Sequence, residues 1–229
     1  MHIGGIQRFS SIDFPGNLAA VIFTVGCNFR CPFCHNPKLV CGNVDPIAEA
    51  YVLEFLTTRT RQLEGVVISG GEPTLQQDLF QFIEKVRTLG FSIKLDTNGT
   101  HPETLETLLA YQMLDYVAVD IKHVMSRYAF AAGVASPMIE KIQNTIDLLL
   151  NSPVAHEFRT TVIRDFHTLE DVVAISKQIR GAQRYVLQEF IPKTTLDAKF
   201  AEKLPFEKSL LETIIPEVKK NVQQFEIRQ

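Results

Sequence analysis

The sequence predicts an α/β fold, a partial (β/α)6 barrel of the TIM type. Short apolar, β-branched runs alternate along the chain with longer segments of helical periodicity, the pattern of repeated strand–helix units around a parallel sheet. Of the 229 residues, 45% are hydrophobic and 21% are charged, a composition typical of globular proteins. Because a closed eight-fold barrel typically needs about 250 residues, we expect an open barrel of six units.

Six strands and six helices are expected in alternation. The strands are predicted at residues 18–25, 65–69, 92–96, 116–121, 158–163 and 185–190. The helices are predicted at residues 46–58, 76–89, 102–110, 137–151, 169–180 and 206–218. Pro46, Pro102 and Pro137 suit first helical turns, whereas Gly90 and Gly181 suit positions just past helix ends. A short final strand is expected near the C-terminus, at residues 225–227.

The chain is predicted to form a single domain over residues 1–229. Within it, residues 1–17 form an N-terminal extension, residues 18–190 the six strand–helix units, and residues 191–229 a C-terminal helix and short strand. The formal charge of −3 and the pI near 6.1 give no reason to expect a nucleic-acid or membrane partner. The N-terminus lacks a secretory signal, and the longest apolar stretch is too short to span a bilayer as a helix. We therefore expect a cytoplasmic protein.

Three cysteines lie within eight residues, directly after the first predicted strand. Cys27, Cys31 and Cys34 can hold three irons of a cubane 4Fe-4S cluster, because thiolate sulfur is the usual ligand of such clusters. No fourth cysteine completes the set at short range, so one iron stays open to a substrate or cofactor, which indicates catalysis. The alternative is a structural zinc site that adds His35 or Cys41. Cys41 stands apart and is interpreted as a thiol outside the cluster.

A glycine-rich turn follows the second predicted strand. Gly70 and Gly71 let a ligand approach the backbone, and Glu72 places an acidic group beside it. An ordinary strand-to-helix turn is the alternative for this segment on its own.

Charged and hydroxyl side chains follow the third and fourth predicted strands. Asp96, Thr97 and Asp120 supply oxygens suited to a cation, and Lys122 supplies a positive charge for a carboxylate. Helix capping or turn formation is the alternative for each residue alone. Because chemistry in such barrels gathers at the carboxyl ends of the strands, compatible groups at four consecutive strand ends indicate one common site.

These motifs together resemble the radical S-adenosylmethionine (radical SAM) superfamily over nearly the whole chain. The CxxxCxxC loop, with Phe33 before its last cysteine, is the superfamily's most specific mark, and residues 70–73 match its methionine-binding Gly-Gly-Glu-Pro motif. The resemblance implies the radical SAM fold and one 4Fe-4S cluster whose open iron is chelated by the amino and carboxylate groups of S-adenosylmethionine. It also implies that Gly70, Gly71 and Glu72 bind the methionine part and that Phe33 lies near adenine.

More narrowly, the chain resembles the activating enzymes of glycyl radical enzymes. Cys34-His35-Asn36 matches a run found there, and residues 12–16 resemble the family's Asp-x-Pro-Gly stretch. Residues 96–99 and 120–122 match the segments that bind a monovalent cation (Na⁺ or K⁺) and the cofactor carboxylate, which implies these roles for Asp96, Thr97, Asp120 and Lys122. The N-terminal segment, residues 4–16, most resembles the activating proteins of anaerobic ribonucleoside-triphosphate reductase.

The resemblance implies an oxidoreductase that cleaves S-adenosylmethionine reductively to a 5′-deoxyadenosyl radical and generates a glycyl radical on a partner enzyme. That partner is expected to be anaerobic ribonucleoside-triphosphate reductase, with a flavodoxin- or ferredoxin-type reductant. The alternatives are a radical SAM enzyme that acts on a small molecule, like the deazaguanine-forming synthase, and a zinc-stabilised interaction module.

Two further positions are weaker candidates, and one segment departs from the family pattern. Arg159, on the fifth predicted strand, is expected to face the barrel mouth and meet the cofactor or partner, with a surface salt bridge as the alternative. Asp13 is expected to border the barrel opening and face the partner. Where the pyruvate formate-lyase activator has a histidine close to adenine, the similar segment here contains Gln188 and no histidine.

Overall fold

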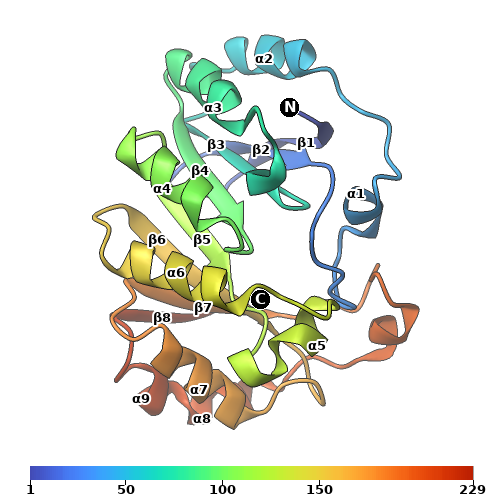
Figure 1. Ribbon diagram of the computed structural model, residues 1–229, viewed down its shortest axis with the longest axis vertical. Coiled ribbons are helices and arrows are strands. Elements are labelled where there is room, and N and C mark those ends of the chain that lie inside the picture. Colours follow the sequence, from blue (N-terminus) through green and yellow to red (C-terminus); the bar gives the residue numbers. More distant parts are fainter. Residues whose placement is uncertain (229) are drawn as a thin grey trace. The chain divides into compact units, whose positions relative to one another are not determined.

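The structure, a computed structural model, describes residues 1–228 and is shown in Figure 1. The described residues form eight strands: β1 (Ile3–Ser10), β2 (Ala19–Thr24), β3 (Gly65–Gly70), β4 (Ser92–Thr97), β5 (Tyr116–Asp120), β6 (Ala155–Val162), β7 (Arg184–Glu189) and β8 (Gln224–Arg228). They belong to one sheet in which the strands neighbour one another in chain order. The pairs β2–β3, β3–β4, β6–β7 and β7–β8 are parallel, and β1 is antiparallel to β2. The predicted α/β class with a mostly parallel sheet is confirmed.

Helices alternate with these strands. The α-helices of the described residues are α1 (Pro37–Cys41), α2 (Glu49–Thr57), α3 (Leu79–Thr88), α4 (Pro102–Ala110), α5 (Tyr128–Ala132), α6 (Ile139–Leu150), α7 (Leu169–Gln178), α8 (Lys208–Thr213) and α9 (Ile215–Val218). Short 3₁₀ turns cover Pro73–Leu75, Met125–Arg127 and Ala198–Glu202. None of the helices within residues 1–228 is long and apolar enough to cross a membrane.

The chain divides into two compact units. The first unit consists of residues 1–28, 38–97 and 101–117, and the second consists of residues 29–37 and 98–100 together with the chain from residue 118 onward. Cys27 therefore belongs to the first unit, whereas Cys31 and Cys34 belong to the second. The expectation of one domain stays a prediction.

Strand register in the first unit aligns the ends of two neighbouring strands. β2 pairs with β3 from Ala19 opposite Gly65 to Thr24 opposite Gly70. Because the two parallel strands end at the same level, the loops that follow them start side by side. These loops carry Cys27 and the glycine-rich turn.

The N-terminal segment contributes to the core of the first unit, which the sequence did not predict. Phe14 is only 3% exposed and belongs to a buried group whose other members are Ala19, Val21, Val67 and Tyr116. The preceding residues form β1, an antiparallel neighbour of β2. The sequence indicates only an N-terminal extension here, because the stability of this strand depends on pairing with β2, and local periodicity does not report such pairing.

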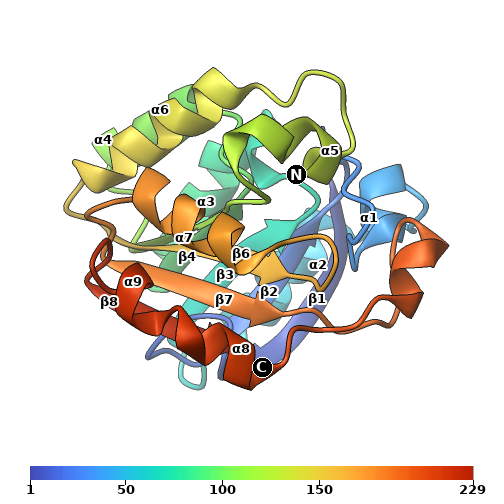
Figure 2. The ribbon, with the colours of Figure 1, turned by 90° about the horizontal axis from the view of Figure 1, so that it is seen from below.

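In the second unit, β6, β7 and β8 run parallel and can be followed in Figure 2. The register places Arg159 opposite Val186 and Val186 opposite Glu226, and it places Gln188 opposite Arg228. Since side chains two apart on a strand share a face of the sheet, one face of these three strands is rich in charged groups.

Several boundaries differ from the predicted ones. The helix expected at residues 206–218 is two helices, α8 and α9, because Pro216 has no N–H to continue the hydrogen-bond ladder of α8. The short helix α5 was not predicted at all. In contrast, α4 spans Pro102–Ala110 as expected, and α7 begins after Thr168, whose side chain forms a capping box with Asp171.

Candidate functional site

The glycine-rich turn lies directly against the residue that precedes Cys27, within the first unit. The N–H of Glu72 donates to the carbonyl of Gly26 at 2.8 Å. A Cβ atom added at Gly71 would overlap that same carbonyl, so only glycine permits this approach. The turn and the start of the cysteine loop are therefore held together through backbone contacts.

The carboxylate of Glu72 is enclosed by hydroxyl and amide donors. Glu72 is 1% exposed, and its Oε1 accepts hydrogen bonds from the N–H of Thr74 at 3.1 Å and from Thr97 Oγ1 at 2.7 Å. The hydroxyl of Thr74 donates to the same oxygen. The Thr97 hydroxyl therefore ties the end of β4 to the turn after β3. In this structure the side chains of Glu72 and Thr97 fix the shape of the loop.

In the second unit, the cysteine loop is anchored by its aromatic residues. The ring of Phe33 packs edge-on against Phe166, with ring centroids 5.5 Å apart, and lies 6.2 Å from Phe200. Phe29 makes an edge contact with Tyr128 at 6.3 Å. The expectation that Phe33 also lies near adenine stays a prediction.

The thiols present a donor set that fits an Fe–S cluster. All four cysteines are thiols and none is a disulfide; Cys31 is buried, while Cys27 and Cys34 are half-buried. The N–H of Asn36 donates to Cys34 Sγ at 3.4 Å, a type of contact that tunes cluster ligands. Among residues 1–228, no group of three or more His, Cys, Asp and Glu side chains stands arranged as a metal site. The match between this site and an Fe–S cluster therefore depends on the chemistry of the three thiols within one short loop.

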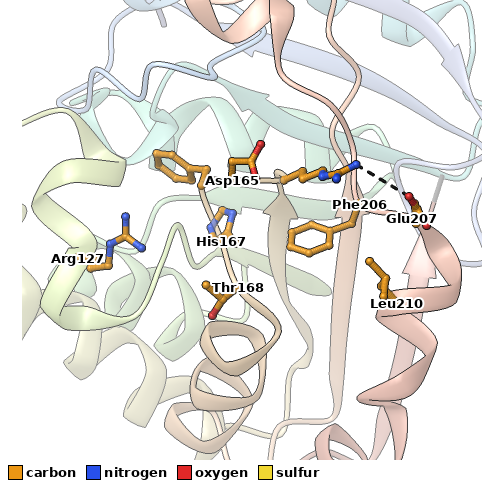
Figure 3. A pocket seen from close by; sticks show the side chains of 9 residues that line it. Arg127, Asp165, His167, Thr168, Phe206, Glu207 and Leu210 are labelled. Atoms are coloured by element: carbon orange, nitrogen blue, oxygen red, sulfur yellow. Dashed lines mark ion pairs between the residues drawn. The ribbon is translucent and has the colours of Figure 1, made fainter.

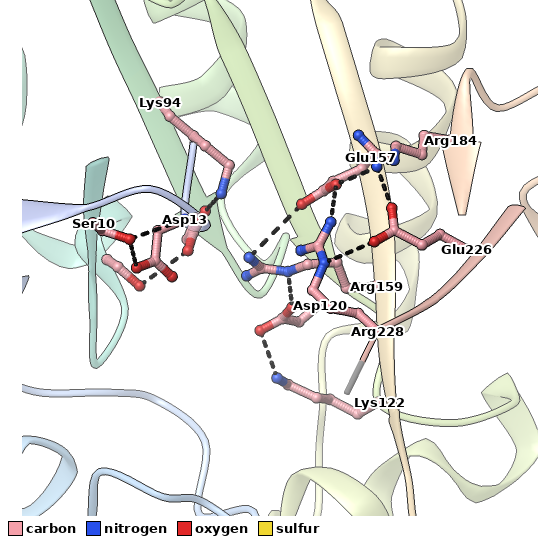
Figure 4. Close-up of polar contacts among 12 residues, drawn as sticks. Ser10, Asp13, Lys94, Asp120, Lys122, Glu157, Arg159, Arg184, Glu226 and Arg228 are labelled. Carbon is pink, nitrogen blue, oxygen red and sulfur yellow. Dashed lines mark hydrogen bonds and ion pairs between the residues drawn. The ribbon is translucent and has the colours of Figure 1, made fainter. Parts of the chain in front are cut away.

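Asp96 lies beside an internal cation in the first unit. The Nζ atom of Lys94, which is labelled in Figure 4, lies 2.6 Å from Asp96 Oδ1, and Ser69 Oγ donates to Asp96 Oδ2 at 3.2 Å. The Lys94 side chain is 1% exposed and the Asp96 side chain is 13% exposed, so the cation of this pair is buried and the carboxylate is partly exposed. Its Nζ also lies over the ring of Tyr116 at 5.8 Å from the centroid. The sequence analysis missed Lys94, although its spacing of two from Asp96 on a strand already places both on one face.

Asp120 lies between two cations in the second unit (Figure 4). Arg159 Nε is 2.8 Å from Asp120 Oδ1, and Lys122 Nζ is 3.0 Å from Oδ2. Burial by itself raises the pKa of Asp120, but Arg159 and Lys122 outweigh it and hold that pKa well below its usual range. Burial likewise opposes the charge of Lys122, yet Asp120 raises the pKa of Lys122 above its usual value. Asp120, Lys122 and Arg159 are therefore all charged at neutral pH.

The two weaker candidates have defined surroundings. The Arg159 side chain is 10% exposed and forms an ion pair with Asp120, whose side chain is 30% exposed. Asp13 Oδ2 accepts a hydrogen bond from Ser10 Oγ at 2.5 Å, and the N–H of Asp13 donates back to that hydroxyl at 3.1 Å. This arrangement is a local turn. The expected contacts of Arg159 and Asp13 with a partner stay predictions.

A charged network that the sequence analysis did not identify continues from Arg159. Arg228 Nε lies 3.2 Å from Glu226 Oε1, and its Nη2 lies 3.7 Å from the buried Glu157 (Figure 4). Arg184 pairs with Glu226 as well. The signal was present in the sequence, because charged residues recur at spacings of two in these strands.

Two cavities in the second unit adjoin these elements. One, of about 380 Å³, lies at the ends of β6 and β7 and is lined by His35, Thr161, Gln188, Glu189, Ile191, Lys193 and Thr194. His35 stacks on Phe190 at 5.3 Å. The other, of about 320 Å³, is shown in Figure 3; His167 lines it, and Arg164 and Glu207 form an ion pair across it at 3.9 Å.

Comparison with protein families gives one match over most of the chain. Residues 21–179 match the model of the radical SAM superfamily. A protein of Methanocaldococcus jannaschii named as a glycyl-radical enzyme activating enzyme is 37% identical over 213 residues, which cover 90% of this chain and 86% of that protein. The pyruvate formate-lyase-activating enzyme of Clostridium pasteurianum is 26% identical over 97% of this chain and 95% of its own length.

Solved structures share the fold. The Streptococcus suis SuiB structure bound to S-adenosylmethionine superposes with a TM-score of 0.71 and 14% identity over 91% of this chain. The present chain spans half the length of SuiB. QueE from Escherichia coli superposes with a TM-score of 0.55 and 19% identity, covering 100% of this chain and 93% of QueE. At these identities the likeness concerns the fold.

Proposed function

Since this chain belongs to the radical SAM superfamily, we propose that it is an activating enzyme that generates a glycyl radical on a partner enzyme. The observation that supports the proposal most is the 37% identity, over 86% of its length, to a relative named for that activity. The Gly-Gly-Glu turn and the charged group around Asp120 lie at strand ends, where radical SAM enzymes bind their cofactor.

In this proposal, Cys27, Cys31 and Cys34 hold three irons of one 4Fe-4S cluster. When bound, the reduced cluster and S-adenosylmethionine would together supply the radical chemistry, using one electron from an external reductant. A hydrogen atom would pass from the Cα of one glycine in the partner to the 5′-deoxyadenosyl group. The products would be methionine, 5′-deoxyadenosine and a glycyl radical, so each turnover would use one electron and one cofactor.

The chain's own residues bind and orient the cofactor. Gly70, Gly71 and Glu72 shape the turn that receives the methionine amino group. Lys122, kept charged beside Asp120, supplies a permanent positive charge for the methionine carboxylate. Phe33 contributes near adenine, and Arg159 and Asp13 face the partner.

A monovalent cation is part of the proposal. Asp96, Thr97 and Asp120 provide oxygen donors of the kind that Na⁺ or K⁺ takes. Lys94 and Lys122 already stand beside the two carboxylates. Cofactor binding compared in sodium, potassium and choline salts tests this point: dependence on Na⁺ or K⁺ supports the ion, whereas equal binding in choline assigns the positive charge to the two lysines.

The proposed partner is anaerobic ribonucleoside-triphosphate reductase, and the proposed electron donor is a flavodoxin- or ferredoxin-type protein. The support is the resemblance of the N-terminal segment, residues 4–16, to the activators of that reductase. We place the reaction in the cytoplasm, because a reducing compartment keeps the cysteines available as thiolates.

The experiment is an anaerobic incubation of the reconstituted protein with reductant, S-adenosylmethionine and the reductase. The expected result is a doublet glycyl-radical signal in the EPR spectrum and about one 5′-deoxyadenosine per radical, because the hydrogen moves once and the cofactor supplies the radical. A reductase variant whose radical-forming glycine is replaced by alanine is the matched control. Repeated turnover on a small molecule, with no glycyl signal on any glycyl radical enzyme, would overturn the proposal.

A further inference from the structure

We propose that Tyr128 is a positioning residue that fixes the Asp120–Lys122 segment and joins it to the cysteine loop. This inference rests on the proposed function, because it assigns a role in holding the cofactor-binding segment. Tyr128 belongs to none of the sequence motifs. The contacts that carry the inference all lie within the second unit.

The hydroxyl of Tyr128 closes a backbone ring at the end of β5. Tyr128 is fully buried, its Oη accepts a hydrogen bond from the N–H of Lys122 at 3.2 Å, and it donates to the carbonyl of Asp120 at 3.3 Å. Burial raises the pKa of Tyr128, so the hydroxyl keeps its proton for this role. One buried hydroxyl thus holds the two residues whose side chains form the charged pair.

The same tyrosine begins the helix against which the cysteine loop rests. Its ring contacts Phe29 edge-on. At the other end of α5, the N–H of Arg30 donates to the carbonyl of Ala132 at 2.8 Å, and a Cβ added at Gly133 would overlap the Arg30 carbonyl. Residues 29 and 30 lie directly before Cys31, so α5 connects the loop of the cluster ligands to the carboxylate-binding segment.

A second buried side chain supports the segment from the loop after β6. His167 Nε2 lies 3.0 Å from the carbonyl of Lys122. Its Nδ1 accepts from the N–H of Ile163 at 3.3 Å, which leaves Nε2 as the donor. The N–H and the carbonyl of Lys122 are therefore both bound by buried side chains. These two hydrogen bonds fix the backbone position from which the Lys122 side chain extends.

The test compares two tyrosine variants of the anaerobically reconstituted protein. Tyr128→Phe removes one hydroxyl and keeps the ring against Phe29. Tyr185→Phe is the matched control, because Tyr185 is also fully buried in the second unit and its hydroxyl donates to Thr160 Oγ1 at 3.0 Å, without contact to Asp120 or Lys122. Binding of S-adenosylmethionine is measured by calorimetry, and amide hydrogen exchange of residues 120–122 is measured by mass spectrometry in the cofactor-free protein.

We expect Tyr128→Phe to weaken cofactor binding about tenfold, the effect of leaving buried polar groups unpaired, and to speed exchange of residues 120–122. Iron content should equal that of the wild type, and Tyr185→Phe should change neither binding nor exchange. Equal binding and equal exchange in Tyr128→Phe and wild type would overturn the inference, as would equal losses in both variants. Wild-type protein that assembles no cluster or binds no S-adenosylmethionine would instead overturn the proposed function, while the exchange measurement would still decide whether Tyr128 holds the segment.

Discussion

Arg159 Nε lies 2.8 Å from Asp120 Oδ1, and this contact has no counterpart in the linear motifs, because the two residues are 39 positions apart. It occupies one carboxylate oxygen while Lys122 occupies the other. The Arg159 guanidinium, together with the Lys122 ammonium, outweighs the effect of burial, which by itself favours the protonated acid. The ionisation of Asp120 thus depends on a residue from a different strand.

Removal of Arg159 should therefore make cofactor binding depend on pH. In Arg159→Met only Lys122 opposes the effect of burial, so the pKa of Asp120 rises above its wild-type value. As the pH falls through that raised pKa the carboxylate is lost, and affinity for S-adenosylmethionine should decrease by up to about tenfold per pH unit. Wild-type affinity should stay level between pH 8 and 6. Arg184→Met is the control, because Arg184 pairs with Glu226 and not with Asp120. Parallel pH profiles for wild type and Arg159→Met would contradict this role.

Cluster assembly should require three cysteines and not the fourth. Cys27→Ala, Cys31→Ala and Cys34→Ala each remove an iron ligand and should abolish the 4Fe-4S cluster after anaerobic reconstitution. The exposed Cys41 in α1 is the control, and Cys41→Ala should keep the iron and sulfide content of the wild type. Loss of the cluster in Cys41→Ala would disprove the three-ligand assignment. Zinc in place of iron would support the structural alternative.

Gly71→Ala should disturb the start of the cysteine loop. The added methyl group would overlap the carbonyl of Gly26, and overpacking of this kind typically destabilises a protein by about 1–3 kcal/mol. The midpoint temperature of thermal unfolding and the iron content after reconstitution should both decrease. Gly5→Ala provides the comparison, because its Cβ would meet only Phe23, at 3.4 Å, an ordinary contact. Full iron loading in Gly71→Ala would argue against the close approach.

Stability should decrease at acidic pH partly through His167. Burial lowers the pKa of His167 to about 4, from its ordinary value of 6.5. The unfolded state therefore binds the proton first, and the stabilisation present above pH 6.5 should be lost as the pH falls toward 4. Each such histidine contributes at most about 1.4 kcal/mol per pH unit.

The measurement is urea unfolding of reduced, metal-free protein across this pH range. His167→Gln should flatten the dependence of the unfolding free energy on pH, whereas replacement of the exposed His2 by glutamine should leave the slope unchanged. The buried His123 and His156, whose pKa values burial also lowers, should keep part of the slope in the His167 variant. An unchanged slope in His167→Gln would refute the assignment.

The α/β class and the family can be predicted from local patterns: apolar runs of strand length, helical periodicity, and cysteines at short fixed spacing. These patterns place α4 to the residue and the strands β2 to β8 to within a few residues, since proline and glycine mark the ends of elements through their own backbone preferences.

The groups that neutralise the buried charges, and the contacts that hold the loops, cannot be predicted from local patterns, because they depend on how distant segments pack together. Arg159 meets Asp120 and Tyr128 holds Lys122 through contacts between different elements, while β1 and the burial of Phe14 depend on pairing with β2 and on the core beneath it. Such contacts arise from packing between segments distant in sequence, and the free energy of a buried ion pair depends on its surroundings more than on residue identity. A local pattern of amino acids predicts neither the packing between distant segments nor the surroundings of a buried ion pair.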